Sequence, residues 1–181
     1  KINIINIGRF TDQKDQITLL KAVNEIKKKI KFRLIIIGRG KEKNNLVSYI
    51  KRNNLSKNIK LINFLDNPFN LIRSSDLFIL TSIYEGLPNV LLEAQTLKKF
   101  IISSDCPTGP KEILLNGKAG YLFKPRNYKK LANLITSYVE NKKKLSKKIR
   151  IGYNNLDRFD FEKNLKKYLN IINSLLYKPS R

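Results

Sequence analysis

The chain has 181 residues, of which 37 are Lys or Arg and 14 are Asp or Glu, giving a formal net charge of +23 with 41% hydrophobic residues. This length suits one α/β domain, and the composition is that of a folded chain rather than a disordered one. Because histidine is absent and Cys106 is the single cysteine, imidazole-based catalysis, an intramolecular disulfide and a cysteine-rich zinc site are all excluded.

Short apolar, β-branched segments alternate with longer segments of 3.6-residue periodicity, which is typical of βαβ units and a mostly parallel sheet. Strands are predicted, in chain order, over residues 2–7, 32–37, 59–64, 77–80, 100–103 and 121–123. Helices are predicted between them over residues 16–29, 44–53, 68–74, 88–97 and 110–115. The sequence therefore predicts an α/β, Rossmann-like three-layer sandwich around a sheet of about six strands.

Beyond Arg126 the pattern is wholly helical, with helices predicted over residues 128–140, 145–151 and 161–176. We interpret 1–181 as a single domain with a core at 2–126 and a helical extension at 127–178. This extension either packs on the sheet or reaches toward something outside the chain.

The positive charge is spread over both halves of the chain, and its densest runs, 27–29 and 142–144, fall at predicted helix ends, where the helix dipole favours cations. Three interpretations are open: a solvated surface, attraction to an anionic membrane, and nucleic-acid binding. Because neither a basic arm nor an RNA-binding aromatic signature is found, we expect no nucleic-acid partner.

The sequence also bears on location. No apolar run approaches the ~18 residues of a membrane-spanning helix, and no signal peptide opens the chain. We therefore expect a cytoplasmic protein, with peripheral contact at the inner face of the membrane as the alternative that the charge leaves open. The chain starts at Lys1, without Met and directly before an apolar strand, so we expect a domain of a longer protein.

In an open parallel sheet, ligands bind outside the carboxyl ends of the strands, where helix N-termini present unpaired N–H groups. Three loops that follow predicted strands carry glycines or charges, and they begin at Gly8, Gly38 and Ser82. We expect these loops to converge on one crevice.

The first two loops give modest signals. Arg9 and Lys14 are spaced so that both can point at a phosphate over the next helix, although ordinary surface cations would also explain them. Gly38 and Gly40 would let the backbone come close to a ligand, although a plain turn is the commoner reason for such a pair.

The loop after the fourth strand gives a sharper signal. Pro88 suits the first turn of a helix and Gly86 permits close approach. The amides near Leu87, Asn89 and Val90 would then be free to bind an anion.

Two carboxylates accompany this loop, which begins at Ser82, contains Gly86 and Pro88, and is called the elbow from here on. Glu85 lies within it and Glu93 lies about two turns along the following helix, so both should face the same crevice. Carboxylates accept hydrogen bonds, so sugar hydroxyls rather than phosphate are their expected partners. Glu93 stands in an apolar run between Leu92 and Ala94, where an unpaired charge would be costly, and this favours a functional role over a surface one.

These residues resemble the C-terminal, donor-binding domain of family 4 glycosyltransferases, which are retaining enzymes of the two-domain GT-B fold. The resemblance covers about residues 2–140. Its most specific part runs from Ser75 to Ala94 and holds Glu85 and Glu93 in the family's E-x7-E pattern. The segment SDCPTGPKEI at 104–113 is similar to a subgroup that builds bacterial lipid-linked oligosaccharides and surface polysaccharides such as capsule and lipopolysaccharide.

The resemblance implies a role for each matching residue. Arg9 and Lys14 would hold the donor diphosphate and stabilise the departing nucleoside diphosphate. Glu85 would contact the donor sugar near the reacting carbon, and Glu93 would bind the ribose hydroxyls. The uracil base would lie near residues 63–65. The other donor-binding residues would be Gly8, Gly38, Gly40, Phe64, Leu65, Gly86, Leu87, Pro88, Asn89 and Val90.

The expected chemistry needs no metal. No Asp-x-Asp pair or metal-binding triad is visible, so Arg9, Lys14 and the helix N-terminus would offset the charge on the leaving diphosphate without a cofactor. The resemblance implies two partners, a nucleotide-sugar donor, expected to be a UDP-sugar, and an N-terminal acceptor domain that would precede Lys1. We therefore expect this domain to bind donor without turnover.

Two other functions stay open. One is a UDP-sugar epimerase or phosphorylase on the same scaffold, and the other is a non-catalytic membrane-surface or scaffold module derived from a transferase. The absence of histidine disfavours an epimerase that uses one. The complete set of Arg9, Lys14, Glu85 and Glu93 disfavours a degenerate module.

The sequence departs from the family pattern in two places. Asp66 follows the Phe-Leu pair at a position where glycine is common, and Lys98-Lys99 precede the fifth strand where the family usually has a glycine. Cys106 is expected to be a small packed side chain, because no base stands near it to activate the thiol.

Overall fold

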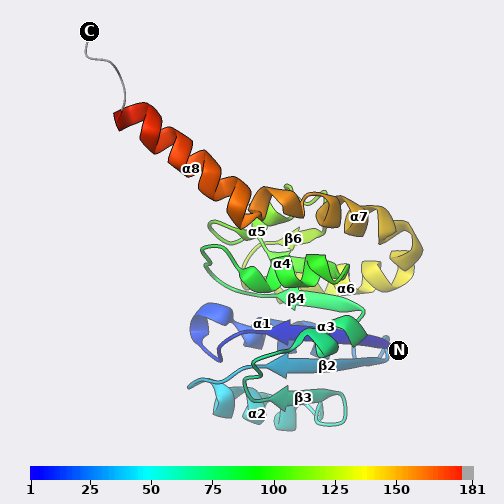
Figure 1. Cartoon of the computed structure of the whole chain (residues 1–181). Coiled ribbons are helices and arrows are strands. Elements are labelled where there is room, and N and C mark those ends of the chain that lie inside the picture. The colour runs from blue at the N-terminus through cyan, green and yellow to red at the C-terminus, as the bar shows by residue number, and fades with distance from the viewer. Residues whose placement is uncertain (177–181) are drawn as a thin grey trace.

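The computed structural model describes residues 1–176 and contains one six-stranded sheet (Figure 1). All of its strand pairs are parallel, in the order β3-β2-β1-β4-β5-β6. The strands are β1 (Ile2–Ile7), β2 (Phe32–Ile37), β3 (Ile59–Ile62), β4 (Leu77–Leu80), β5 (Phe100–Ser104) and β6 (Tyr121–Phe123). The predicted α/β class and three-layer architecture are confirmed, and the sheet is wholly rather than mostly parallel.

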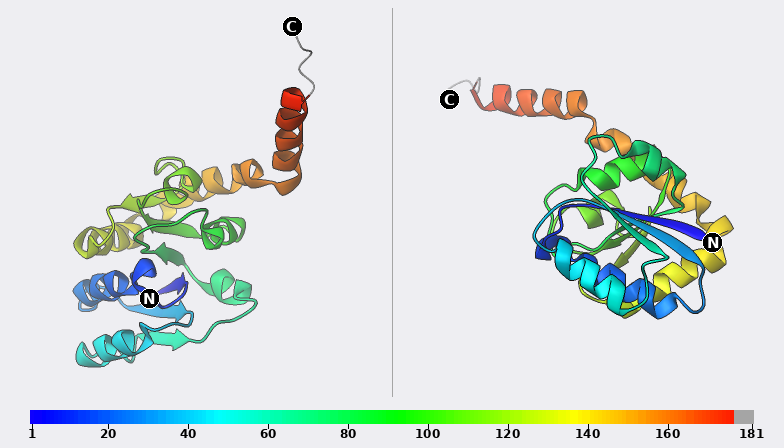
Figure 2. Two further views of the ribbon diagram at one scale, coloured as in Figure 1. Left: turned by 90° about the vertical axis from the view of Figure 1, so that its left-hand side faces the viewer. Right: turned by 90° about the horizontal axis from the view of Figure 1, so that it is seen from below.

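Helices cover both faces of the sheet, as the two views in Figure 2 show. One face packs against α1 (Gln16–Ile26), α2 (Lys43–Arg52) and α6 (Tyr128–Asn141). The other face packs against α3 (Phe69–Ser74), α4 (Asn89–Thr96), α5 (Pro110–Ile113) and α7 (Ser146–Asn154). Because both faces are buried, the strands read as continuous apolar runs, and neighbouring residues such as Ile4 and Ile5 enter opposite cores.

The predicted strand and helix ends differ from the structure by a few residues, for local reasons. β3 ends at Ile62 rather than at residue 64, because its ladder with β2 ends at the pair Ile37 and Ile62. α5 ends at Ile113 rather than at residue 115, and Leu115 already has a left-handed backbone with φ of 52°. Pro88 precedes α4 as its N-cap instead of lying in its first turn.

The helical extension divides into two parts. α6 and α7 pack on the body of the domain, and their buried or half-buried side chains include Leu131, Ile135 and Ile151. α8 (Phe161–Leu176) instead projects away from the body and has no buried residue (Figures 1 and 2). The first expectation, packing on the sheet, therefore holds for α6 and α7, whereas what α8 projects toward stays a prediction; the last predicted residues, 177 and 178, lie outside the described residues.

Within residues 1–176, none of the helices combines the length and the apolar character that crossing a membrane requires.

The backbone conformation of Lys98 explains why the family usually has glycine before the fifth strand. Lys98 has φ of +55°, a left-handed conformation that glycine adopts without cost, which explains the preference for glycine at this position. Its ammonium lies 4.4 Å from the centre of the Tyr153 ring, a cation–π contact between the α4–β5 turn and α7.

Asp76, the residue before β4, is hydrogen-bonded to β1, to α6 and to Lys142 just after α6. Its carboxylate accepts hydrogen bonds from the Asn3 amide at 2.9 Å and from Lys142 Nζ at 2.6 Å. Its carbonyl accepts the Tyr138 hydroxyl at 3.0 Å. Burial raises the pKa of this carboxyl, but the bonds from Lys142 and Asn3 outweigh burial, so that the pKa lies below the ordinary value of 3.8.

Replacing Asp76 with Asn should lower the free energy of unfolding by about 1–2 kcal/mol at neutral pH, because the charge-assisted bonds weaken. The lowered pKa means that the carboxylate stabilises the fold above pH 3.8 and that this contribution is lost as the pH falls through the folded-state pKa. Urea unfolding should show a constant difference between parent and variant near neutral pH that shrinks below about pH 4. A difference that persists undiminished in acid would contradict this.

Candidate functional site

The site lies where the strand order reverses, between the neighbouring strands β1 and β4. The chain leaves β1 toward α1 on one face of the sheet and leaves β4 toward α4 on the other face. The loops that follow β1 and β4 therefore meet at the carboxyl edge before the chain passes to opposite faces of the sheet. This is the position where open parallel sheets bind ligands.

A salt bridge joins the two loops across this point. Lys14 Nζ lies 2.6 Å from Glu85 Oε1, and the side chains are only 15% and 7% exposed. The Ser82 hydroxyl donates to the same oxygen at 2.5 Å. We expected Glu85 to be a free acceptor for sugar hydroxyls, but in the structure one of its oxygens is already engaged. Glu85 Oε2 has no hydrogen-bond partner in residues 1–176 and is left to accept from a ligand.

Backbone contacts hold the same two loops in register. The Ile83 amide donates to the Gln13 carbonyl at 2.8 Å, and Gln13 Nε2 donates to the Tyr84 carbonyl at 3.0 Å. The Thr81 hydroxyl donates to the Lys14 carbonyl at 2.9 Å. Lys14 and Glu85 are thus positioned by their loops as well as by their attraction for each other.

Arg9 is an exposed cation, unpaired within residues 1–176, at this edge of the sheet. Its side chain is exposed and forms no salt bridge with any described residue. The next residue, Phe10, is fully buried, and its amide donates to the Arg39 carbonyl at 2.9 Å. The loop is therefore fixed at Phe10 while the Arg9 guanidinium extends into solvent.

The two glycines of the second loop serve packing between loops. A Cβ at Gly38 would lie 2.0 Å from the Gly8 carbonyl oxygen, and a Cβ at Gly40 would lie 2.3 Å from that of Phe10. Gly38 is also buried. The sequence left two explanations open, close approach of the backbone to a ligand and a plain turn. The structure shows close approach, but it is the approach of the second loop to the first loop.

The expected base site is an exposed surface beside these loops. Phe64 and Leu65 are 56% and 36% exposed. The Arg39 guanidinium lies 5.4 Å from the centre of the Phe64 ring. Arg39 was not among the predicted site residues, although its position between Gly38 and Gly40 is a signal that could have indicated it.

The elbow before α4 presents free amides. No described group accepts from the N–H groups of Gly86, Leu87, Asn89 or Val90, and α4 has no side-chain N-cap. Pro88 is buried and fixes the start of the helix. These N–H groups are free to bind an anion, and the helix dipole would favour one there, so the anion site stays a prediction.

The β5–α5 loop supports the elbow from behind. The Thr108 hydroxyl donates to the Glu85 carbonyl, and Gly109, with φ of +65°, packs directly against the Gly86 carbonyl. Cys106 in this loop is buried, as predicted, and burial raises the pKa of its thiol. The sequence analysis gave Ser82 no role, because a small hydroxyl side chain carries little signal without a structure.

Glu93 occupies a separate groove between α3 and α4. The groove has a volume of about 500 Å³, and its lining includes Phe69, Arg73 and Asn89. The Glu93 carboxylate makes no hydrogen bond or salt bridge with any residue in 1–176, and burial raises its pKa. It is an unpaired, half-buried acceptor, and it shares the groove with Asn89 at the start of α4. No direct contact with Lys14 or Glu85 is found.

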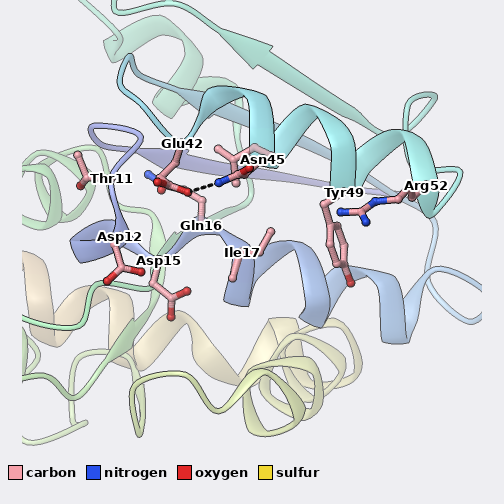
Figure 3. A pocket seen from close by; sticks show the side chains of 10 residues that line it. Thr11, Asp12, Asp15, Gln16, Ile17, Glu42, Asn45, Tyr49 and Arg52 are labelled. Carbon is pink, nitrogen blue, oxygen red and sulfur yellow. Dashed lines mark hydrogen bonds between the residues drawn. The ribbon is translucent and has the colours of Figure 1, made fainter.

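A further pocket lies between α1 and α2 and has a volume of about 310 Å³ (Figure 3). Its lining includes Asp12, Asp15 and Tyr49, and a hydrogen bond of 2.7 Å joins Asn45 to Glu42 at one wall. None of the predicted site residues lines it. No cluster of three or more His, Cys, Asp or Glu side chains that could hold a metal ion is found in the described part of the chain.

The sequence matches the family model "Glycosyl transferases group 1" over residues 1–155. The chain belongs to this glycosyltransferase family. It is 36% identical over 194 residues to an uncharacterized glycosyltransferase of Methanocaldococcus jannaschii, covering 91% of this chain and 48% of that protein. It is 29% identical to the poly(ribitol-phosphate) α-N-acetylglucosaminyltransferase of Staphylococcus aureus, covering 93% of this chain and 35% of that protein.

Solved glycosyltransferase structures share the fold. A crystal structure of a mutant of S. aureus TarM, in complex with UDP among other ligands, superimposes with a TM-score of 0.87 at 26% identity, covering 96% of this chain and 36% of that one. Anabaena HepE in complex with UDP also gives 0.87, at 22% identity, and covers 49% of that chain. The Rossmann-like fold of GT-B glycosyltransferases is thereby confirmed. The chain spans about half or less of the length of these relatives.

The packing of Gly109 against the elbow can be tested with a matched pair of glycines. An alanine Cβ at Gly109 would lie 2.1 Å from the Gly86 carbonyl oxygen, whereas one at Gly117, with φ of +86°, would have its nearest neighbour at 4.0 Å. Both substitutions should cost about 1–2 kcal/mol from left-handed backbone strain. Gly109→Ala should cost clearly more, because the elbow must also move. Equal losses in thermal unfolding would show that the loop does not brace the elbow.

Proposed function

We propose that this chain is the donor-binding, C-terminal half of a retaining glycosyltransferase that uses a UDP-sugar. The observation that carries the proposal is the carboxyl edge between the neighbouring strands β1 and β4, where adjacent loops present Lys14, Arg9 and the free amides before α4, so that all can approach one diphosphate. Family membership and the fold shared with UDP-bound relatives support the same ligand.

In this proposal the cations act on the leaving group. Negative charge accumulates on the nucleoside diphosphate as the sugar bond breaks, and Arg9, Lys14 and the α4 N-terminus stabilise it. Glu85 holds Lys14 in place through Oε1 and offers Oε2 to a hydroxyl of the donor sugar. These groups supply the electrostatic stabilisation directly, so we propose that the reaction proceeds without a metal ion.

Glu93 would bind the ribose. Its carboxylate is unpaired and half-buried in the groove that begins at Asn89, so two ribose hydroxyls would satisfy an acceptor that has no partner in the described chain. The base would lie against Phe64 and Leu65, whose apolar surfaces are exposed next to Arg39. Each part of the nucleotide then meets a group of matching chemistry.

The acceptor would bind to a second domain. The relatives are about two to three times as long as the matched region, which supports an N-terminal half that supplies the acceptor pocket. The projecting α8 supports the same arrangement, since its apolar side chains, among them Leu165 and Leu169, have no cover in residues 1–176. Relatives named for an undecaprenol-diphosphate-linked glycan and for poly(ribitol-phosphate) support a lipid-linked or polysaccharide acceptor.

The UDP site is tested by calorimetric titration of the 181-residue chain with UDP. We expect saturable heat that chelator leaves unchanged, and Glu93→Ala should weaken binding by about 1.5–3 kcal/mol through lost charge-assisted hydrogen bonds. Glu140→Ala, an exposed glutamate on α6, is the matched control and should bind like the parent. No saturable heat at millimolar UDP would overturn the site. Equal binding by the parent and Glu93→Ala would overturn only the ribose role, and loss of binding with chelator would overturn the metal-free proposal.

The proposal that a second domain binds the acceptor is tested by measuring UDP release by the isolated chain. Given a UDP-sugar and an acceptor extract, the isolated chain should release UDP no faster than the uncatalysed control, because it lacks the acceptor pocket. Release of UDP that depends on Lys14 would show that this half is catalytically complete and would contradict the proposal.

A further inference from the structure

The two ends of the sheet differ in charge. The segments that connect each strand to the next helix, 8–15, 38–42, 63–68, 81–88, 105–109 and 124–127, hold six basic and six acidic residues. The basic residues are Arg9, Lys14, Arg39, Lys41, Lys124 and Arg126, and the acidic ones are Asp12, Asp15, Glu42, Asp66, Glu85 and Asp105. The carboxyl edge, which carries the candidate site, is therefore balanced in charge.

The opposite edge is strongly positive. Its segments, 27–31, 53–58, 75–76, 97–99, 114–120 and 142–145, hold eleven lysines and a single acidic residue, Asp76. The lysines, which we call the basic face, are Lys27, Lys28, Lys29, Lys31, Lys57, Lys98, Lys99, Lys118, Lys142, Lys143 and Lys144. Much of the chain's excess charge is thus gathered at the end of the sheet where β1 begins, marked by the N-terminus in Figure 1.

Most of these lysines are free to meet a partner. All except Lys27 and Lys99 are exposed. Lys27 donates to the Asn53 carbonyl at 2.8 Å, and Lys99 donates to the Ser75 carbonyl at 3.0 Å. Lys142 pairs with Asp76, and the other exposed members form no salt bridge within residues 1–176.

Helix dipoles alone do not explain this face. They favour cations in the last turn of a helix, which accounts for a run such as 27–29 after α1. Lys31, Lys57 and Lys118 lie beyond their helices and closer to the next strand, outside the reach of that effect. The lack of acidic residues beside these lysines therefore needs an explanation that applies to the whole basic face.

The shape of the basic face favours a planar partner. Lys57 precedes the edge strand β3 and Lys118 precedes the opposite edge strand β6, so the charges span the sheet. Lys28 follows α1 in one helical layer and Lys98 follows α4 in the other, so they also span the sandwich. A nucleic-acid strand needs a linear track with aromatic side chains for its bases, and the nearby exposed Tyr153 already lies under Lys98. A bilayer surface needs only charges spread over a plane.

We propose that the basic face binds the surface of an anionic lipid bilayer. The candidate nucleotide site lies at the other end of the strands, so lipid bound to the basic face would not cover it. Binding to lipid is electrostatic, falls with salt, and is independent of nucleotide, so the proposal stands apart from the proposed function.

The test is sedimentation of the chain with vesicles of phosphatidylcholine containing about one third phosphatidylglycerol, at about 0.05 M and about 0.5 M NaCl. We expect binding at low salt, loss of binding at high salt, and none to pure phosphatidylcholine. The variant Lys28→Gln, Lys29→Gln, Lys143→Gln, Lys144→Gln should bind at least about tenfold more weakly, because four charges leave the face.

The matched control removes the same charge elsewhere. Lys129→Gln, Lys130→Gln, Lys166→Gln, Lys167→Gln changes four exposed lysines on α6 and α8 and should bind within about twofold of the parent. Circular dichroism and thermal unfolding establish that both variants are folded. Equal binding by the two variants would overturn the assignment to this face, and so would binding to neutral vesicles. Salt-sensitive binding of duplex DNA without binding to the anionic vesicles would show that nucleic acid, not lipid, is the partner.

Discussion

The candidate site depends on the salt bridge between Lys14 and Glu85, which crosses the point where the strand order reverses. Nearly buried ion pairs gain little net stability, because desolvation offsets most of their attraction. What this pair supplies is position. With the bonds from Ser82 and Gln13, it fixes the β1–α1 loop against the β4–α4 loop, so the relative position of these loops is set before any ligand arrives. Preorganisation of this kind lowers the cost of binding a diphosphate.

The chain separates its charges along the direction of the strands. At the carboxyl edge, basic and acidic residues are equal in number, so a diphosphate meets a few placed donors rather than a diffuse positive field. At the amino edge, eleven lysines are accompanied by a single acidic residue, Asp76. A net charge of +23 alone would suggest a general polyanion binder. The fold instead places much of the excess charge at the end of the sheet opposite the candidate nucleotide site.

Much of the fold could be predicted from the sequence, because strands that are buried on both faces are continuous apolar runs and turns interrupt them clearly. The elbow at Gly86 and Pro88 was predictable for a similar reason, since each residue type has a specific backbone role there. The pairing of Glu85 with Lys14 was not predictable, because the pattern of parallel strands brings their loops together without fixing which side chains meet. The packing of Gly38 against Gly8 could not be predicted either, because it depends on the register between β1 and β2.

The most direct test of this account is a crystal structure of the chain with UDP. We predict a diphosphate in the crevice between β1 and β4, contacted by Lys14, the Arg9 guanidinium and the amides before α4, with the ribose hydroxyls on Glu93. A nucleotide bound elsewhere, for example in the pocket between α1 and α2, with Lys14 and Glu85 still paired in an empty crevice, would contradict it.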